Sequence, residues 1–461
     1  MTASTFDNLG LKPALLENLQ QLGYSQMTDI QAQSLPLILD HKDVIAQAKT
    51  GSGKTCAFSL GLLENLDVKK FRIQALLICP TRELADQVAS EIRKLARKIH
   101  NIKVLTLCGG MPLGPQIGSL EHGAHIIVGT PGRLLKHLHK NTLNLSNVNT
   151  LVLDEADRML DMGFKDDIDA IIEHCPQRRQ TLLFSATFPP QIEHMAKHIM
   201  NNAERVTIKE SAQKNTIEQY CFSVTDESQR QPSLYQTLLY FLPDNAVIFC
   251  NTKRECGQIS QYLKQHGFCA AALHGDLDQK ERDQTLIRFA NHSLSLLIAT
   301  DVAARGLDIA ALDMVINYQL PRDDEVFVHR IGRTGRAGEK GIAVSLCTER
   351  DNYKRQKLED TLGLSLPLKA LPETKKVAPE ELKSPMVTVE IAGGKRDKIR
   401  PGDIVGALTA DKILTGNDIG KIKIMPTRAF VAVKREDSKQ ALRLLTEGKI
   451  KGRTFRARLI R

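Results

Sequence analysis

Two series of short, continuously apolar segments constrain the fold of this chain more than any other feature. The first series covers residues 43–48, 74–80, 103–108, 125–130, 150–156 and 180–187. The second covers residues 219–224, 245–252, 269–276, 295–301, 314–321 and 341–348. Longer segments with helical spacing of apolar residues, such as 82–99, separate them. A strand that is apolar throughout must be covered on both faces, which is typical of a parallel sheet between helices. We therefore predict two α/β domains.

The last part of the chain has a different order of elements. Strand patterns at 386–394, 419–425, 428–434 and 454–460 alternate with helical patterns at about 401–412 and 437–448. This β-α-β-β-α-β order predicts the ferredoxin-like α+β arrangement of RNA-recognition domains. The polar segment 205–216 and the Pro-, Lys- and Glu-rich segment 366–384 favour linkers. The expected division is domain 1 at 1–206, a linker at 207–216, domain 2 at 217–365, a linker at 366–384 and a C-terminal domain at 385–461.

Positive charge is concentrated in the C-terminal part. Residues 384–461 contain 18 Lys and Arg against 8 Asp and Glu, whereas the preceding 383 residues contain 45 of each kind. The whole excess of +10 therefore lies in the last sixth of the chain. Such asymmetry indicates an appended module that binds a polyanion. A merely solubilising basic domain remains the alternative.

The sequence AKTGSGKT at 48–55 follows the apolar segment 43–48 and precedes a helical pattern. A strand, a glycine-rich loop and a helix start form a phosphate cradle, because backbone N–H groups turn toward one centre. Lys54 would reach the β- and γ-phosphates of ATP, and the Thr55 hydroxyl would bind Mg²⁺. Ala48 stands where the usual pattern has glycine. A flexible helix start without a ligand is the alternative.

An acidic sequence, DEAD at 154–157, ends the apolar segment 150–156. Carboxylates at the carboxyl end of a parallel strand lie at the edge where the phosphate loop also lies. We expect Asp154 to bind Mg²⁺ and Glu155 to orient and deprotonate the attacking water. Without the loop, the same residues could be an ordinary acidic helix start.

Three arginines, Arg330, Arg333 and Arg336, follow one another at three-residue spacing. On a helix this spacing places them on adjacent turns of one face. One interpretation is a solvated basic face. The other is a set of arginines that reaches the γ-phosphate from a second domain, which accelerates hydrolysis roughly 10³–10⁵-fold in other NTPases.

Ten short sequences, in order, resemble the motifs of the DEAD-box RNA helicases, over essentially the whole chain. They are GYSQMTDIQ (23–31), AKTGSGKT (48–55), PTRELA (80–85), GG (109–110), TPGR (130–133), DEAD (154–157), SAT (185–187), VIFCNT (247–252), ATDVAARGLD (299–308) and HRIGRTGR (329–336). The resemblance implies two tandem RecA-like domains with ATP and Mg²⁺ as cofactors, and it accounts for Ala48.

The resemblance also implies roles for individual residues. For the nucleotide, Gln31 would contact the adenine edge, Tyr24 would stack on the ring with Phe6 as an aromatic helper, and Asp308 would contact the ribose. The phosphate loop comprises Ala48, Lys49, Thr50, Gly51, Ser52, Gly53, Lys54 and Thr55. Ser185 and Thr187 would couple the metal site to domain closure, His329 would contact the DEAD sequence, and Arg333 and Arg336 would act in trans. RNA contacts are expected from Pro80, Thr81, Arg82, Gly110, Thr130, Arg133, Gly275, Thr300 and Asp301.

The C-terminal segment resembles the corresponding domain of the bacterial DbpA subfamily, which implies targeting of 23S ribosomal RNA. RAFVAV at 428–433 matches half of an RNA-recognition signature, with Phe430 at the aromatic position. The first half of the signature is missing, so loops and a basic face are the alternative RNA-binding surface. The candidates are Lys421, Lys423, Arg428, Lys434, Arg435, Lys451, Arg453, Arg456 and Arg458. Alternation within 454–460 places Arg456 and Arg458 on one side of a strand.

These features favour an RNA-dependent ATPase and RNA helicase that opens short structured RNA, tethered to 23S rRNA in pre-50S particles during large-subunit assembly. An ATP-gated RNA clamp or assembly scaffold is the alternative, and a DNA translocase is less favoured because no DNA-reading element is present. The nine cysteines form no CxxC pair. This favours reduced thiols, no zinc and a cytoplasmic location. No apolar stretch approaches the roughly 20 residues of a membrane span. No oligomeric state is predicted.

Overall fold

The computed structural model describes residues 5–48, 51–208, 217–304, 312–335, 340–374, 377–378, 380–411 and 413–460. The described residues form two compact units, one up to residue 208 and one from residue 217 onward. The first unit is called domain 1 below. The second unit contains two sheets, which belong to domain 2 and to the C-terminal domain.

Domain 1 is built on a parallel sheet of seven strands in the order β3-β4-β2-β5-β6-β1-β7. The strands are β1 (Val44–Gln47), β2 (Ala75–Ile78), β3 (Val104–Leu107), β4 (Ile126–Gly129), β5 (Thr150–Asp154), β6 (Gln180–Ser185) and β7 (Glu204–Thr207). Each of the first six lies within a segment predicted from its apolar run. The prediction of a linker over 205–216 is wrong at its start, because β7 pairs with β1 there.

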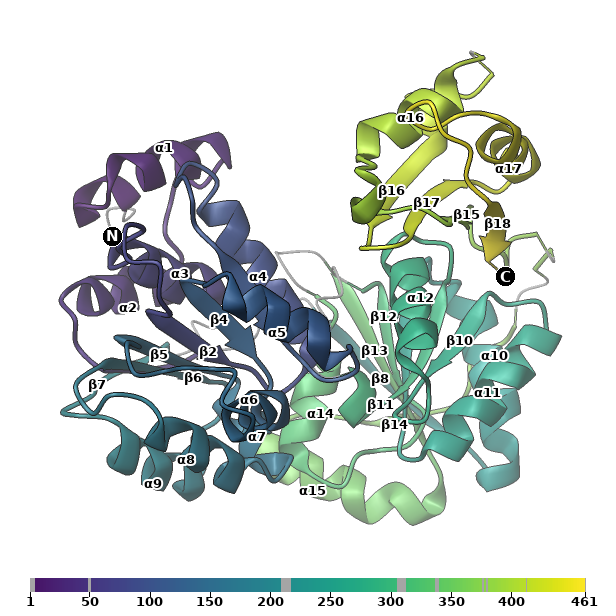
Figure 1. Cartoon of the computed structure of the whole chain (residues 1–461). Helices are drawn as coiled ribbons and strands as arrows, with labels where there is room; N and C mark the ends of the chain where they lie inside the picture. Colours follow the sequence, from purple (N-terminus) through teal and green to yellow (C-terminus); the bar gives the residue numbers. More distant parts are fainter. Residues whose placement is uncertain are drawn as a thin grey trace. The chain divides into compact units, whose positions relative to one another are not determined.

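Helices cover both faces of this sheet (Figure 1). One layer contains η1 (Phe6–Leu9), α1 (Pro13–Gln21), α2 (Asp29–Leu39), α3 (Lys54–Glu64) and α4 (Arg82–Leu95). The other contains α6 (Pro131–His139), α7 (Ala156–Asp161), α8 (Lys165–Glu173) and α9 (Pro190–Ile199). The helix α5 (Leu113–Glu121) follows the edge strand β3, and its Leu120 packs against the core of this second layer. Neighbouring residues of β5 bury their side chains in opposite cores: Val152 packs with the first layer and Leu153 with the second. This is why the strand is apolar at every position.

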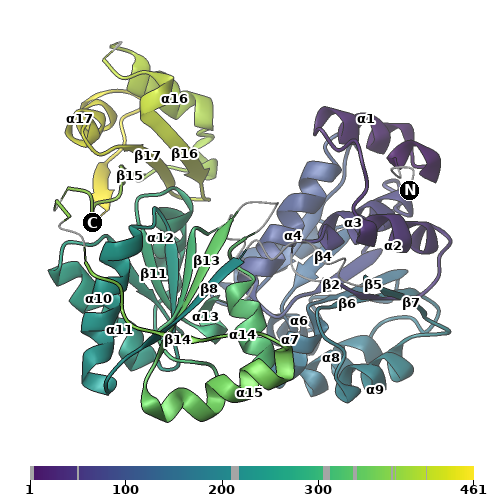
Figure 2. The ribbon, with the colours of Figure 1, turned by 180° about the vertical axis from the view of Figure 1, so that it is seen from behind.

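Domain 2 repeats this plan with the strand order β10-β11-β9-β12-β13-β8-β14, again parallel. Its strands are β8 (Ile217–Ser223), β9 (Ala246–Cys250), β10 (Ala270–Leu273), β11 (Leu296–Thr300), β12 (Met314–Asn317), β13 (Gly341–Cys347) and β14 (Leu368–Lys369). Its helices are η2 (Glu227–Gln229), α10 (Arg230–Phe241), α11 (Lys253–Gln265), α12 (Gln279–Ala290), α13 (Asp301–Ala304), α14 (Asp324–Ile331), η3 (Glu349–Asp351) and α15 (Asn352–Leu362). Figure 2 shows α10 and α11 on one side of the sheet and α14 and α15 on the other.

The segment 366–384, predicted as a linker, packs on domain 2 along part of its length. Within it β14 joins the sheet beside β8. Leu371 and Leu382 pack against the core that lies under α10 and α11. The Gln236 side chain donates a hydrogen bond of 2.7 Å to the carbonyl of Pro372. The segment is therefore part of the surface of domain 2 as well as a connection.

The C-terminal domain is an antiparallel sheet of four strands in the order β16-β17-β15-β18. Its elements are β15 (Met386–Ile391), η4 (Lys395–Asp397), α16 (Pro401–Thr409), η5 (Gly416–Asp418), β16 (Ile419–Ile424), β17 (Ala429–Lys434), α17 (Ser438–Glu447) and β18 (Ala457–Ile460). The two helices cover one face, where Val389, Val431 and Leu445 form part of the core. The predicted ferredoxin-like order is confirmed.

Polar contacts join the other face of this sheet to domain 2. Thr388 on β15 is fully buried, and its hydroxyl contacts Asn291 at 2.9 Å and Ser293 at 2.8 Å. The Lys421 ammonium donates to the carbonyl of Ala290 at 3.0 Å. Because these groups come from the end of α12 and the loop after it, the outer face of the sheet is covered by domain 2.

The burial of the cysteines and the length of the helices bear on two further predictions. Cys56, Cys79 and Cys250, predicted as small core residues, are buried, and burial raises the pKa of the Cys56 thiol to about 12. Among the helices of the described ranges, none is both long and apolar enough to span a bilayer.

Candidate functional site

The glycine-rich loop of domain 1 lies at the carboxyl end of β1. The N–H of Ala48 donates to the carbonyl of Ser185, at the end of the adjacent strand β6, over 3.1 Å. Gly51 and Gly53 have φ angles of 87° and 95°, which side chains other than glycine rarely adopt. The helix α3 then begins at Lys54. The loop thus turns into a helix N-terminus whose unpaired N–H groups attract an anion.

Gln31, predicted to contact adenine, is tied to this loop. Its side-chain oxygen accepts a hydrogen bond from the N–H of Thr28 at 3.0 Å, and its amide nitrogen donates to the carbonyl of Gly53 at 3.2 Å. A Cβ atom added to Gly53 would lie 2.6 Å from that nitrogen. Glycine is therefore required where the loop passes the start of α2.

The two predicted adenine-stacking rings have different surroundings. Phe6 is buried in the core beneath α1, with 3% of its surface exposed, so its ring is not open to a base in this structure. Tyr24 is half-buried, and its hydroxyl contacts Glu91 at 3.1 Å and the ammonium of Lys94 at 3.0 Å. Burial raises the pKa of Tyr24. The structure therefore leaves Tyr24 as the more accessible ring.

Asp154 and Lys54 are buried polar side chains with atoms that lack a hydrogen-bond partner within the described residues, namely Oδ1 of Asp154 and Nζ of Lys54. Burial raises the pKa of Asp154 to about 6; the Lys54 ammonium opposes this rise and the Glu155 carboxylate adds to it. Leaving such atoms unpaired costs about 1–3 kcal/mol each. The pair therefore fits a ligand that carries both anionic oxygens and a cation, as ATP with Mg²⁺ does. Thr55, half-buried beside Lys54, is the hydroxyl that could join such a cation.

Glu155 stands between β5 and α7 in a left-handed backbone conformation, with φ of 55°. Its carboxylate accepts a hydrogen bond of 2.8 Å from Arg158, and both side chains are more than nine-tenths buried. This ion pair helps to hold Glu155 in its strained backbone conformation. Arg158 was not singled out from the sequence, although its position one helical turn after Glu155 could have suggested the pair.

Asp157 connects the DEAD sequence to the SAT sequence. Its Oδ2 accepts hydrogen bonds from the N–H groups of Ala186 and Thr187, at 3.1 and 3.0 Å, and from the Thr187 hydroxyl at 3.1 Å. The N–H of Asp157 donates to the Ser185 hydroxyl at 3.3 Å. Burial favours a raised pKa for Asp157, but the hydrogen bonds, first that from the Thr187 N–H, hold its pKa below the usual value. Ser185 and Thr187 are thus joined by hydrogen bonds to Asp157 at the start of α7, and their role in coupling stays a prediction.

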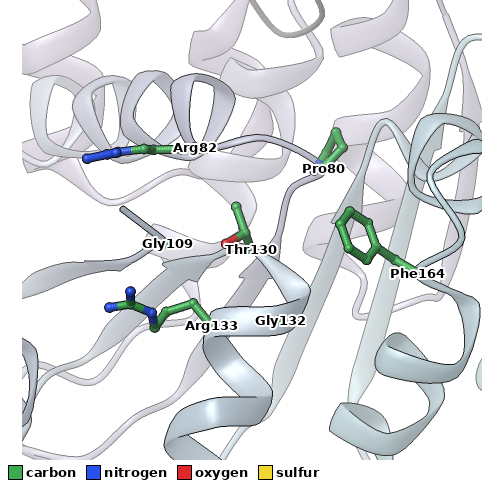
Figure 3. A pocket seen from close by; sticks show the side chains of 7 residues that line it. All are labelled: Pro80, Arg82, Gly109, Thr130, Gly132, Arg133 and Phe164. Carbon is green, nitrogen blue, oxygen red and sulfur yellow. The ribbon is translucent and has the colours of Figure 1, made fainter. Parts of the chain in front are cut away.

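A separate hollow on domain 1 gathers several of the predicted RNA contacts. Figure 3 shows Arg82 and Arg133 extending toward one side of it, with Thr130 between them and Phe164 at the opposite end. The other lining residues are Pro80, Gly109 and Gly132. NH1 of Arg82 is buried and has no hydrogen-bond partner within the described residues. Phe164 was missed in the sequence because no motif contains it.

Backbone geometry shapes the rim of this hollow. The Thr81 hydroxyl caps α4 by accepting from the N–H of Leu84 at 3.3 Å. Thr130 is the residue before α6, and Gly110 is exposed with φ of 74°. The N-termini of two helices therefore face the region where Arg82 and Arg133 lie, an arrangement that attracts phosphate.

Arg330 forms hydrogen bonds with several motif residues of domain 2. It is fully buried and forms two bonds to the carboxylate of Asp301, at 2.6 and 2.8 Å. It also donates to the side chains of Asn317 and Asn251, each at 3.2 Å, and to the carbonyl of Gln319. Asp301, predicted to contact RNA, is thus held by an internal ion pair beside Thr300 at the end of β11.

The prediction that Arg330, Arg333 and Arg336 share one helical face is wrong for Arg333. The helix α14 ends at Ile331, since Gly332 follows, and Arg333 lies in the next turn with its side chain buried. His329 lies within α14 and is half-buried, and Gly275 is exposed after β10. Four predicted residues lie outside the described residues: Lys49, Thr50, Asp308 and Arg336.

The prediction of Phe430 as an RNA contact does not fit this structure, because the ring is 1% exposed. It projects from the covered face of the C-terminal sheet, opposite Glu390 on β15. Glu390 is itself buried and pairs with Arg428 at 3.0 Å and with Arg458 at 2.6 Å. Two of the predicted basic contacts are therefore partly neutralised by one carboxylate.

The other basic candidates divide into bonded and exposed groups. Lys434 pairs with Asp418 at 2.6 Å, Arg435 donates to the carbonyl of Ser384 at 2.6 Å, and Lys451 donates to the carbonyl of Lys398. Lys423, Arg453 and Arg456 are exposed. The exposed group is the one available to a polyanion without breaking an internal contact.

Family models match three parts of the chain. They are the DEAD/DEAH box helicase model over residues 28–195, the helicase conserved C-terminal domain over 233–338, and the DbpA RNA binding domain over 388–459.

Individual relatives agree with these matches. The chain is 50% identical to the ATP-dependent RNA helicase DbpA of Escherichia coli (strain K12) over 461 residues, which is 100% of both chains. It is 43% identical to the DEAD-box ATP-dependent RNA helicase CshA of Bacillus subtilis (strain 168) over 358 residues, covering 77% of this chain and 72% of that one. The solved structure of S. cerevisiae Dbp5 bound to RNA and ADP BeF3 matches with a TM-score of 0.73 and 32% identity, covering 80% of this chain and 96% of that one.

The fold, the motif residues and these matches agree at every level, and the chain belongs to the DEAD-box family of ATP-dependent RNA helicases, with a DbpA-type RNA-binding domain at its C-terminal end.

Proposed function

We propose that this chain couples ATP hydrolysis to the local opening of short, structured RNA, and that its C-terminal domain tethers it to 23S rRNA in pre-50S particles in the cytoplasm. The observation that carries the tether is the DbpA RNA binding domain match at 388–459, in the part of the chain that holds the whole excess of positive charge. Phosphate contacts supply most of the affinity of such basic surfaces.

ATP is proposed to bind at the glycine-rich loop of domain 1. Lys54 would neutralise its phosphates, and Asp154 and Thr55 would hold Mg²⁺, which supplies charge neutralisation at the phosphates. Glu155, held by Arg158, would accept a proton from the attacking water. The support is that Lys54 and Asp154 are buried with polar atoms that have no hydrogen-bond partner among the described residues.

Arg333 and Arg336 are proposed to act on the same nucleotide from domain 2. The RNA path is proposed to pass over Arg82, Thr130 and Arg133. Contacts there to phosphate and 2′-OH groups would bind RNA without reading its sequence. S. cerevisiae Dbp5, which shares this fold at 32% identity, was solved bound to RNA and ADP BeF3, which supports the proposal that this chain also binds a nucleotide and RNA.

Two substitutions test the ATPase site. Lys54→Ala should abolish ATP turnover, whereas Glu155→Gln should retain nucleotide binding and slow hydrolysis. Wild-type turnover in either variant contradicts the assignment. Strand displacement measured with ATP and with a non-hydrolysable analogue separates a helicase from an RNA clamp. A helicase displaces strands in repeated turnovers with ATP, whereas a clamp displaces little with either nucleotide.

The tether is tested by charge reversal on the C-terminal domain. Lys423→Glu combined with Arg456→Glu should weaken stimulation of the ATPase by a 23S rRNA fragment, and should spare stimulation by a generic RNA at saturation. A matched control reverses two exposed lysines of domain 1, Lys140 and Lys197, and keeps the same net charge. Equal losses in the two double variants would show a general charge effect and would remove the support for a specific tether.

A further inference from the structure

The hollow lined by Pro80, Arg82, Gly109, Thr130, Gly132, Arg133 and Phe164 is called the RNA hollow below. Hydrogen bonds hold the side chain of Arg133 in place at its rim. Both of its terminal nitrogens donate to the carbonyl of Met111, each at 2.9 Å, and NH1 also donates to Oε1 of Gln116 at 2.8 Å. A guanidinium has five N–H hydrogens. These contacts leave Nε–H and one NH2 hydrogen without a partner among the described residues. The group is thus held at one side and open at the other.

The amide of Gln116 has only one possible orientation in this network. Its nitrogen donates to the carbonyl of Cys108 at 3.2 Å, so its oxygen must face the opposite way. That oxygen meets both NH1 of Arg133 and Nε2 of His137, the latter at 2.9 Å. Because the oxygen only accepts, Nε2 of His137 must carry a hydrogen, a tautomer assigned from the network.

His137 holds the far end of this chain of hydrogen bonds. It lies on α6 one turn after Arg133, is completely buried, and has Nδ1 2.8 Å from the hydroxyl of Thr142. Burial, together with the nearby Arg133 charge, lowers the pKa of His137, so the ring is neutral at neutral pH. A neutral ring with hydrogen on Nε2 satisfies the amide oxygen of Gln116.

We propose that His137 and Gln116 are positioning residues for RNA, which act through Arg133 by holding its guanidinium toward the hollow. This inference rests on the proposed RNA path and adds to it the side chains that set its geometry. Ordering a free arginine side chain costs about 1.5–2 kcal/mol. Because the hydrogen-bond network orders the Arg133 side chain before RNA binds, binding loses less free energy to that ordering.

A buried histidine can also be purely structural, and domain 1 contains a matched example. His125 is likewise fully buried, and its ring nitrogens contact the N–H of Lys103 at 3.1 Å and the carbonyl of Val68 at 3.2 Å. These partners, and Phe71 whose ring packs against that of His125, are not predicted RNA contacts. His125→Leu therefore reports the cost of losing a buried histidine without affecting Arg133.

The test measures RNA-stimulated ATPase activity of the full-length protein as a function of RNA concentration. His137→Leu should raise the RNA concentration for half-maximal rate roughly five- to tenfold, the scale of part of an arginine's ordering cost. The rate at saturating RNA should change less than about twofold, because the ATP site is untouched. His137→Gln, which keeps an N–H at the position of Nε2, should restore most of the RNA affinity. His125→Leu should lower the unfolding temperature and leave the RNA dependence unchanged.

A double-mutant cycle makes the inference specific. Arg133→Ala alone should weaken RNA binding at least as much as His137→Leu, and adding His137→Leu to it should have no further effect. If Arg133→Ala weakens binding but His137→Leu does not, or if the two effects add in full, the positioning role is wrong while the RNA path stands. If Arg133→Ala itself leaves the RNA dependence unchanged, the RNA path is wrong. Gln116→Leu repeats the cycle should His137→Leu fail to fold.

Discussion

The buried carboxylate of Asp154 leads to a prediction with an unusual sign: its replacement by asparagine should stabilise the ligand-free protein. The side chain is 3% exposed, and its Oδ1 has no hydrogen-bond partner among the described residues. Burial raises its pKa to about 6. Ionised at neutral pH, the group is therefore held in an environment that disfavours its charge, and the neutral amide of similar shape escapes that cost.

The magnitude follows from proton linkage. With a pKa of about 6 in the folded state and about 3.9 in the unfolded chain, the shift corresponds to about 3 kcal/mol at about 1.4 kcal/mol per unit. Because the folded pKa of Asp154 is the higher one, the folded state binds the proton more tightly. Stability is therefore favoured below pH 4 and is lost as the pH rises through 6. At pH 7.5 the full penalty applies to the wild type and not to Asp154→Asn.

Thermal unfolding of the full-length protein in EDTA without nucleotide measures this effect between pH 4.5 and 8. For a domain of this size, 1 kcal/mol shifts the midpoint by about 2–4 °C. Asp154→Asn should therefore raise the midpoint of the domain 1 transition by about 5 °C or more at pH 7.5, and the gain should shrink steadily below pH 6. A lowered midpoint at pH 7.5, or a gain of equal size at pH 5 and pH 8, would refute the reasoning.

Three further predictions have outcomes set by hydrogen bonding. Asp157→Asn should lower the free energy of unfolding of domain 1 by about 2 kcal/mol, the scale of a charge-assisted hydrogen bond. Because the folded pKa of Asp157 is lowered, this loss should be constant from pH 8 down to pH 6, as calorimetry can check. Arg330→Leu should destabilise domain 2 by about 3 kcal/mol in urea unfolding, the low end for breaking a buried ion pair, because Asp301, which is left unpaired, is one quarter exposed. Asn291→Leu should destabilise the contact between domain 2 and the C-terminal domain, and Thr388→Val on that background should cost little more; additive losses in a double-mutant cycle would show that the two side chains are not coupled.

Much of the fold could be predicted because it depends on local patterns. Strands such as β5 are apolar at every residue, which a central parallel strand requires. The strand β7 was missed because it lies at the sheet edge and buries only Val206. The strand β14 has two residues, both exposed, so nothing in its composition marks it. Edge strands are defined by their neighbours, and neighbours are not visible in a linear pattern.

The residues of the candidate site could be predicted where a short sequence motif contains the side chains that would contact the ligand. The loop that contains Gly53 and Lys54 and the strand end at Asp154 lie where the motifs predict them. The network of His137, Gln116 and Arg133 could not be predicted, since it joins two helices through one amide oxygen. The signature match at 428–433 predicts Phe430 as an RNA contact, but a linear pattern cannot show that domain 2 covers that face of the sheet.

Hydrogen-bond satisfaction divides the motif residues into two groups with different roles. Asp157 and Arg330 have their polar atoms paired within their own domains, so their work is to hold neighbouring motifs in place. Lys54, Asp154 and Arg82 each have a buried polar atom without a hydrogen-bond partner in the described part of the chain. Each such atom costs about 1–3 kcal/mol in the ligand-free protein. Other buried atoms without a partner, such as Oε1 of Gln180 and Nε of Arg355, lie outside the motifs, so an unpaired atom alone does not mark a ligand site. Within the motifs, however, such atoms lie at the nucleotide loop and at the hollow beside Thr130, where an anionic ligand would pair with Lys54 and Arg82.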